Sequence, residues 1–162
     1  MSAPTLHFFC GKAGAGKSTR AKAIAAAQGA LLLSEDVWLS RLYGDQIVVF
    51  DDYIRCSQKL LNVVKPLVAD VLRLGQSVVM DFPANTRRRR SGFRSVFEDA
   101  GANHVLHVLQ TPDALCLERI RQRNREMPEG ASQLTEADYW HVTSFFEAPD
   151  DAEGFNMQVY AA

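Results

Sequence analysis

Residues 11–18 read GKAGAGKS and match the pattern G-x-x-x-x-G-K-[ST] at every fixed position. The flanking segments fit the same motif. Residues 5–10 (TLHFFC) are apolar, as in a short buried strand, and residues 18–28 (STRAKAIAAAQ) are rich in alanine, the best helix former. The order of strand, glycine-rich loop and helix leaves few folds open to this chain. It predicts an α/β domain in which the loop wraps a chain of phosphate groups.

The residue types in this loop suit a triphosphate. Glycine at positions 11, 14 and 16 lets backbone N–H groups approach an anion, and the positive end of the following helix points to the same place. Lys17 is expected to reach the β and γ phosphates, Ser18 to bind Mg²⁺ and Thr19 to reach the α phosphate. A chance glycine-rich turn before a helix is the alternative. The expected cofactors are ATP and Mg²⁺, and the expected nucleotide-binding residues are Gly11, Lys12, Ala13, Gly14, Ala15, Gly16, Lys17, Ser18 and Thr19.

The composition narrows the class of protein. The chain has 162 residues, 47% of them hydrophobic, which is enough for a single domain with a proper core over residues 1–162. A net charge of -1 does not favour general binding to nucleic acid duplexes. Three widely spaced cysteines do not suggest a disulfide framework, so a reducing cytoplasm is expected. Because there is no basic leader and no apolar run of membrane-spanning length, we expect a soluble protein without a membrane partner.

Strand-like and helix-like segments alternate along the rest of the chain. Further strands are expected over residues 30–33, 76–81, 103–109 and 155–160, and helices over residues 36–43, 53–74, 86–100, 111–125 and 136–146. Strands separated by helices in this way predict a parallel, doubly wound sheet that binds ligands at the carboxyl ends of its strands. Pro66 lies inside the longest helical segment and predicts a kink there or a break between two helices.

Two carboxylates follow strands that should end beside the loop. Asp36 comes after the second strand and is the candidate base that accepts a proton from an attacking hydroxyl, with Glu35 as its substitute. The alternative is that both acids only begin a helix. Asp81 is expected to end the third strand and to hold Mg²⁺ together with Ser18, unless it only caps the next turn.

Arginines are the third expected element of the site. Arg119 and Arg123 lie four residues apart and share one face of a helix, where both guanidinium groups could stabilise a phosphoryl group in transfer. Arg121 and Arg125 should face elsewhere. The helix dipole alone also favours basic residues at this end of a helix. We expect these arginines on a small lid over about residues 121–137.

Four consecutive arginines, residues 87–90, point in different directions on a helix, so most of them should be solvated. Asn85 or Thr86 is expected to cap this helix, and Arg90 could turn toward the acceptor. The four histidines form no metal-binding set, since His104 and His107 fall on opposite faces of a strand.

The segments GKAGAGKST, LSEDVWL, VVMDFPANTRRRR and LERIRQRN together resemble the P-loop kinase group that contains polynucleotide kinase, zeta toxin and chloramphenicol phosphotransferase. The chain looks most like the bacterial kinases described as zeta-toxin-like or AAA-type ATP-binding domains, and the resemblance covers essentially all of it. It implies a five-stranded sheet of order 2-3-1-4-5, ATP with Mg²⁺, Asp36 as catalytic base and a lid that carries Arg119 and Arg123.

Polynucleotide kinases have an arginine three residues after the base, whereas this chain has Leu39. Apolar and aromatic residues near the two acidic strand ends would instead line an acceptor pocket, unless they belong to the core. The candidate acceptor contacts are Trp38, Leu39, Phe82, Asn85 and Arg90. The expected function is transfer of the γ-phosphoryl group of ATP to a hydroxyl of a small molecule. The alternatives are a kinase for oligonucleotide 5′-hydroxyl groups and an ATPase switch that acts through a protein partner.

Overall fold

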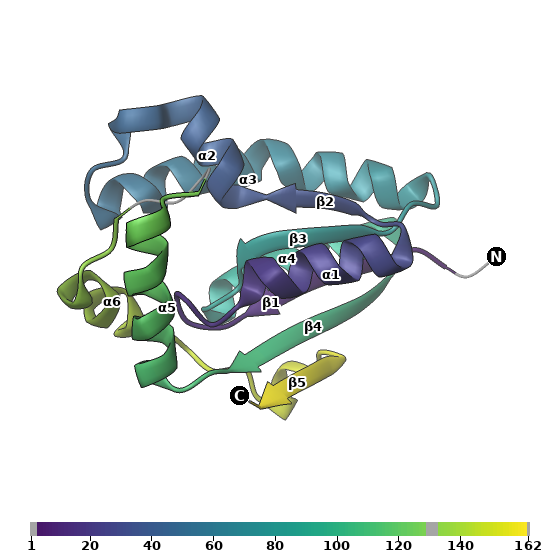
Figure 1. The fold of residues 1–162 in the computed structure, drawn as a ribbon. Coiled ribbons are helices and arrows are strands. Elements are labelled where there is room, and N and C mark those ends of the chain that lie inside the picture. The colour runs from purple at the N-terminus through teal and green to yellow at the C-terminus, as the bar shows by residue number, and fades with distance from the viewer. Residues whose placement is uncertain (1–2, 129–132, 162) are drawn as a thin grey trace.

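A sheet of five parallel strands forms the centre of the protein, in the order β2-β3-β1-β4-β5 (Figure 1). The computed structural model describes residues 3–128 and 133–161. The strands are β1 (Thr5–Cys10), β2 (Leu31–Ser34), β3 (Val78–Pro83), β4 (Asn103–Gln110) and β5 (Met157–Ala161). The helices are α1 (Lys17–Gln28), α2 (Glu35–Tyr43), α3 (Phe50–Arg73), α4 (Arg87–Ala100), α5 (Asp113–Glu126) and α6 (Glu136–Thr143), with short 3₁₀ helices η1 (Gly44–Gln46) and η2 (Asp151–Glu153). The predicted fold class and strand order are confirmed.

Helices cover both faces of the sheet because side chains alternate along each strand. From β1, Phe8 packs on the side of α3 and α4, where its ring centroid lies 5.4 Å from that of Phe93, and Phe9 joins the core on the side of α1 and α5. Figure 1 shows α1 in front of the sheet and α4 behind it. Since all strands run in the same direction, their carboxyl ends and the loops that follow lie along one edge of the sheet.

α3 is one continuous helix with Pro66 inside it. The sequence predicted either a kink or a break between two helices at Pro66, and the break does not occur. Pro66 lies on the exposed side of the helix, whereas Leu60 and Leu72, on either side of it, pack into the same core cluster. The burial of apolar side chains along one face outweighs the loss of a backbone donor.

β3 continues past Asp81 to Pro83, although the sequence predicted that Asp81 would end it. Ser34, the last residue of β2, pairs in register with Asp81. The end of β2 thus lies beside the middle of β3. This register brings Asp36, just after Ser34, into the neighbourhood of Asp81.

Arg90 is fully buried, which corrects the expectation that it turns toward an acceptor. Its Nε and Nη2 donate to the carboxylate of Glu153 in η2 at 2.9 and 3.3 Å, and its Nη1 donates to the carbonyl of Ala84 at 3.0 Å. A buried guanidinium needs its donors satisfied in this way. Arg90 therefore ties α4 to the segment before β5.

Replacing Arg90 by leucine is expected to lower the free energy of unfolding by about 3 kcal/mol, because the largely buried Glu153 carboxylate loses its partner. Urea unfolding followed by circular dichroism measures the change. Arg88→Leu removes the same charge from an exposed position on α4 and should change the stability by no more than about 0.5 kcal/mol. Equal effects of the two substitutions would contradict this role of Arg90.

Cys10, Cys56 and Cys116 are buried and free. Their thiols belong to the core clusters on the two faces of the sheet. Within the residues that the structure describes, no helix is long and apolar enough to cross a membrane.

Candidate active site

The loop between β1 and α1 has a backbone conformation that depends on its glycines. Gly14 (φ 76°) and Gly16 (φ 103°) lie in the left-handed region that favours glycine. A Cβ atom at Gly14 would lie 2.5 Å from the carbonyl oxygen of Cys116, so a larger residue there would require a shift of α5. α1 begins directly behind the loop at Lys17. A loop followed directly by a helix N-terminus is an arrangement of backbone N–H groups that suits an anion.

Asn85 holds the start of this loop. Its Oδ1 accepts from the backbone N–H of Gly11 and its Nδ2 donates to the carbonyl of Gly11, both at 2.9 Å. Thr86 caps α4 instead, since its Oγ1 accepts from the N–H of Arg89 at 3.1 Å. The sequence suggested Asn85 as a contact to the acceptor, but in the structure both polar atoms of its side-chain amide are hydrogen-bonded to the loop.

Lys17 bends over the loop. Its Nζ donates to the carbonyl oxygens of Gly11 and Lys12, the second at 2.9 Å. Desolvation lowers the pKa of this amine, while the carboxylates of Asp81 and Asp36 act in the opposite direction. An ammonium group held over such a loop is able to neutralise the terminal phosphates of a nucleotide.

Ser18 and Asp81 meet beside the loop. Ser18 Oγ donates to Asp81 Oδ2 at 2.6 Å. A hydroxyl and a carboxylate oxygen are hard ligands of the kind that Mg²⁺ prefers, so this pair fits such an ion. Residues 3–128 and 133–161 contain no group of three or more His, Cys, Asp or Glu side chains that could hold a metal ion. A Mg²⁺ ion at this pair would therefore take its other ligands from phosphate and water.

Asp36 lies in the first turn of α2 and is exposed. Partial desolvation and the charge of Asp81 raise the pKa of its carboxyl, and Arg123 and Lys17 oppose this shift. Asp36 is thus within electrostatic reach of the loop lysine and of the Ser18–Asp81 pair. Glu35 has only 1% of its surface exposed, so it cannot substitute for Asp36 as a base in this conformation.

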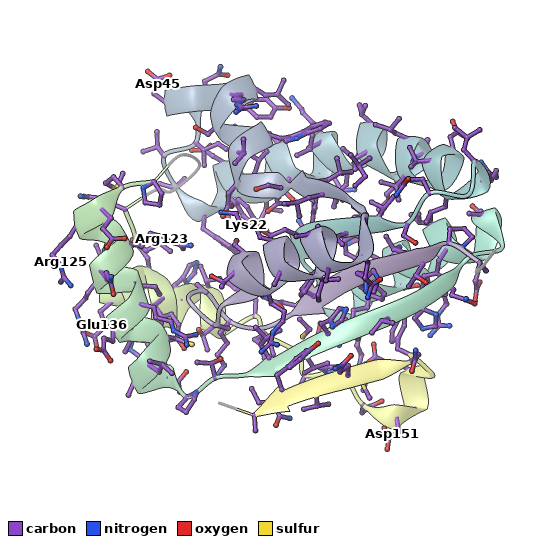
Figure 2. All side chains as sticks on the ribbon, turned by 45° about the vertical axis from the view of Figure 1, so that its right-hand side comes forward. Lys22, Asp45, Arg123, Arg125, Glu136 and Asp151 are labelled. Carbon is purple, nitrogen blue, oxygen red and sulfur yellow. The ribbon has the colours of Figure 1, made fainter. Side chains whose placement is uncertain are left out.

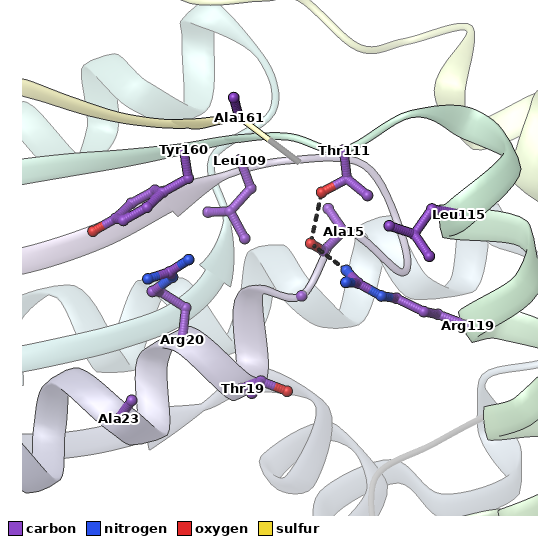
Figure 3. Close-up of a pocket in the computed structure, with 11 residues that line it drawn as sticks. Ala15, Thr19, Arg20, Ala23, Leu109, Thr111, Leu115, Arg119, Tyr160 and Ala161 are labelled. Carbon is purple, nitrogen blue, oxygen red and sulfur yellow. Dashed lines mark hydrogen bonds between the residues drawn. The ribbon is translucent and has the colours of Figure 1, made fainter.

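Arg119 and Arg123 lie on one side of α5 but have different surroundings. Arg119 Nη1 donates to the carbonyl of Ala15 at 2.9 Å and so contacts the loop directly (Figure 3). Arg123 lies on the side of α5 that faces the domain, whereas Arg125 points outward (Figure 2). The charge of Arg123 acts on both Lys17 and Asp36. Of the two arginines, Arg123 is therefore the one whose charge reaches both Lys17 and Asp36.

The expected lid over about residues 121–137 falls only partly within the described part of the chain, because residues 129–132 lie outside it. Asn124 exchanges two hydrogen bonds with the backbone of Leu134, at 2.8 and 3.1 Å. This contact ties the last turn of α5 to the chain that enters α6.

A pocket of about 350 Å³ adjoins the loop at the start of α1 (Figure 3). The guanidinium carbon of Arg20 lies 3.8 Å from the centre of the Tyr160 ring. The Tyr160 hydroxyl forms a hydrogen bond of 2.8 Å with His107. The residues that line the pocket include Gly16, Thr19, Arg20, Thr111, Arg119 and Tyr160. The sequence did not indicate Arg20 or Tyr160, because they come from opposite ends of the chain and belong to no motif.

Leu39 and Phe82 belong to the hydrophobic core, with 4% and 0% of their surface exposed. This corrects the expectation that they line an acceptor pocket. Asp81 and Phe82 are neighbours on β3, so their side chains lie on opposite faces of the sheet. Asp81 faces α1, and Phe82 faces α3 and α4. Trp38 is partly buried and packs against the same core cluster.

A parallel sheet of order 2-3-1-4-5, with a phosphate-binding loop after its central strand, defines a nucleotide-binding domain of the P-loop kinase fold. The family model described as AAA domain (AAA_33) matches residues 6–149, and the chain belongs to this family. No curated protein matches the sequence.

Solved structures of other proteins have the same fold. A candidate kinase from Chloroflexus aurantiacus J-10-fl is 19% identical, with a TM-score of 0.76 over 99% of this chain and 89% of that one. A sugar kinase from Janibacter sp. HTCC2649 is 14% identical, with a TM-score of 0.67 over 99% and 86%. The APS kinase of Mycobacterium tuberculosis, solved with AMPPNP and APS, is 18% identical, with a TM-score of 0.62 over 99% and 90%. At these identities the likeness establishes the fold alone.

Proposed function

We propose that this protein is a kinase that transfers the γ-phosphoryl group of ATP to a hydroxyl group of a small molecule. The observation that carries the proposal is the convergence of three features at the carboxyl edge of the sheet. These features are Lys17 over the loop, the Ser18–Asp81 pair and the exposed carboxyl of Asp36. A cation, a candidate Mg²⁺ site and an accessible carboxylate are the parts that phosphoryl transfer requires.

In the proposed reaction the acceptor oxygen attacks the γ phosphorus, and the bond from this phosphorus to the β,γ-bridging oxygen breaks, so that ADP leaves. Asp36 accepts the hydroxyl proton. Lys17 and Arg123 stabilise the charge on the phosphoryl group in transfer. Ser18 and Asp81 would hold Mg²⁺, whose charge offsets that of the β and γ phosphates when the ion is bound.

The pocket beside α1 is the proposed site of the nucleotide base. It adjoins the loop at Thr19, which we assign to the α phosphate. It is lined by the Arg20 guanidinium, which lies against the Tyr160 ring, and by Arg119, and we assign these flat groups to stacking with the base. Arg119 would then serve the nucleotide, while Arg123 serves the transferred group.

Two kinds of observation support a small acceptor. The sugar kinase and the APS kinase named above share the fold, and Leu39 occupies the position at which polynucleotide kinases carry an arginine. The proposed kinase is a single domain with a lid near residues 121–137. A reducing compartment such as the cytoplasm suits the three free thiols.

An ADP-release screen over sugars, sugar acids, nucleosides, amino alcohols and oligonucleotides with a 5′-hydroxyl tests this function. We expect one class of small hydroxyl compounds to stimulate ADP release, with the phosphorylated product identified by mass spectrometry. ADP release that no acceptor stimulates would contradict a kinase and favour an ATPase switch. Preference for oligonucleotide ends, weakened steeply by salt, would replace the proposed acceptor class.

A further inference from the structure

Glu35, the residue before the candidate base, is a buried carboxyl with several hydrogen-bond partners. Its Oε1 accepts from the hydroxyl of Tyr53, and its Oε2 accepts from Ser57 Oγ at 2.7 Å. Tyr53 and Ser57 both belong to α3. The first residue of α2 is therefore fastened to a second helix.

Arg89 adds a third helix to the same group. Its Nη2 donates to Ser57 Oγ at 2.9 Å, and its Nη1 lies 3.8 Å from Glu35 Oε2. Nη1 is enclosed and has no hydrogen-bond partner among the residues that the structure describes. Glu35, Tyr53, Ser57 and Arg89, called the Glu35 cluster below, link α2 to α3 and α4.

Fold stability alone does not account for this cluster. Taking a carboxyl and a guanidinium out of water costs several kcal/mol, and well-packed apolar side chains of similar volume often give equal or greater stability. Leu39 and Leu60, close by on α2 and α3, are apolar core residues. A chain that needed only to pack α2 against α3 could therefore do so with apolar side chains throughout.

The position of the cluster indicates a different purpose. Glu35 and Asp36 are adjacent at the start of α2, one buried and one exposed. The N-terminal cap of α2 is a long hydrogen bond, since Ser34 Oγ accepts from the N–H of Val37 at 3.4 Å. Burial and the charge of Glu35 raise the pKa of Tyr53, and the charge of Asp36 adds to this shift. The first turn of α2 is thus held by the partners of Glu35 in addition to this long cap.

We propose that Glu35 is a positioning residue, which together with Tyr53, Ser57 and Arg89 fixes the first turn of α2 so that the Asp36 carboxylate stays aligned with the acceptor hydroxyl. This inference rests on the kinase function proposed above. A displacement of reacting groups by about 1 Å can slow a reaction by about 100-fold. Glu35 itself touches no substrate and exchanges no proton in this scheme.

Tyr53→Phe tests the inference because it removes one hydrogen bond to Glu35 and keeps the ring that stacks on Phe50. We expect kcat to fall by about 10- to 100-fold, while the acceptor KM and the Kd of ATP change by less than about twofold. Tyr43→Phe is the matched control, because Tyr43 packs on the same core from α2 and its hydroxyl makes no hydrogen bond within the described residues. An unchanged kcat in Tyr53→Phe, or a rise in acceptor KM alone, would overturn the inference.

A second variant separates positioning from stability. The combined substitution Glu35→Leu, Tyr53→Phe, Ser57→Ala and Arg89→Met replaces the whole cluster by apolar groups. We expect its urea midpoint to equal or exceed that of the wild type, with kcat lowered at least as much as in Tyr53→Phe. Wild-type kcat in this variant would show that Asp36 needs no such support. Glu35→Gln, which keeps one acceptor oxygen, should retain more activity than Glu35→Leu.

The experiments distinguish a failure of the positioning role of Glu35 from a failure of the proposed kinase function. If the wild-type protein phosphorylates no acceptor, the kinase proposal is lost, but crystal structures of the wild type and Tyr53→Phe still test the role of the cluster. The Asp36 carboxylate should move by about 1 Å in the variant. An unmoved Asp36 would refute the positioning role whatever the reaction is.

Discussion

Replacing Lys17 by alanine is expected to weaken ATP binding by at least about 100-fold and to remove detectable phosphoryl transfer, because the variant lacks the ammonium group that we assign to the terminal phosphates. In the structure Lys17 Nζ donates to the carbonyls of Gly11 and Lys12, which leaves it beside the place where a triphosphate would follow the loop. No other lysine lies on α1 close enough to the loop to substitute, since Lys22 is further along the helix and exposed. Titration calorimetry with Mg²⁺ and ATP measures the loss.

Lys22→Ala is the matched control for Lys17→Ala, since it removes the same charge from the same helix (Figure 2). Its affinity for ATP should stay within about twofold of the wild type, as for most exposed substitutions. If Lys17→Ala also bound ATP with wild-type affinity, the loop would not be the nucleotide site, and the proposed function would have to be abandoned.

Asp36→Asn is expected to leave ATP binding intact and to slow phosphoryl transfer by about 100- to 10,000-fold, the range that a positioned general base supplies. The substitution keeps the shape of the side chain and removes its ability to accept a proton. Because the pKa of Asp36 is raised from its ordinary 3.8, the wild-type rate should rise with pH through a value above 3.8, and Asp36→Asn should lack this rise. A pH profile of kcat at saturating acceptor measures both effects.

The stability of Asp36→Asn distinguishes lost chemistry from lost folding. A carboxyl whose pKa is raised on folding opposes the folded state once it ionises, so its removal should leave the protein as stable as the wild type or more stable at neutral pH. Asp45→Asn, on the exposed η1 turn, is the control for the loss of a charge. Unchanged transfer in Asp36→Asn would exclude Asp36 from the reaction.

The parts of the site that the sequence predicted are those with local causes. β1 runs from Thr5 to Cys10 as expected, and the loop that follows takes its path from glycines whose positive φ angles can be foreseen from residue type. That Asp36 and Asp81 lie at the same edge of the sheet follows from a general rule for parallel sheets. Their closeness also depends on the register that pairs Ser34 with Asp81, before the end of β3. The roles of these side chains remain predictions.

The burial and the hydrogen-bond partners of the clustered arginines could not be predicted, because those partners lie far away in the chain. Residues 87–90 form a uniform run, yet Arg90 is buried against Glu153, which lies 63 residues later, and Arg89 reaches Ser57 on α3. Helical spacing gives the directions of such side chains but not what each direction meets. Arg90 is therefore neither solvated, as expected for most of the run, nor turned toward an acceptor, as the sequence allowed.

By itself, the sequence determined that a strand, a glycine-rich loop and a helix follow one another near Lys17. It also determined that strands and helices alternate along the rest of the chain. Both results depend only on short-range backbone geometry and on the periodicity of apolar residues. Only the tertiary structure decided that Phe82 belongs to the core, that Arg20 and Tyr160 share a pocket, and that Glu35 is buried while Asp36 is exposed. These outcomes depend on which face of the sheet each strand presents and which distant element covers it, and no local pattern encodes that pairing.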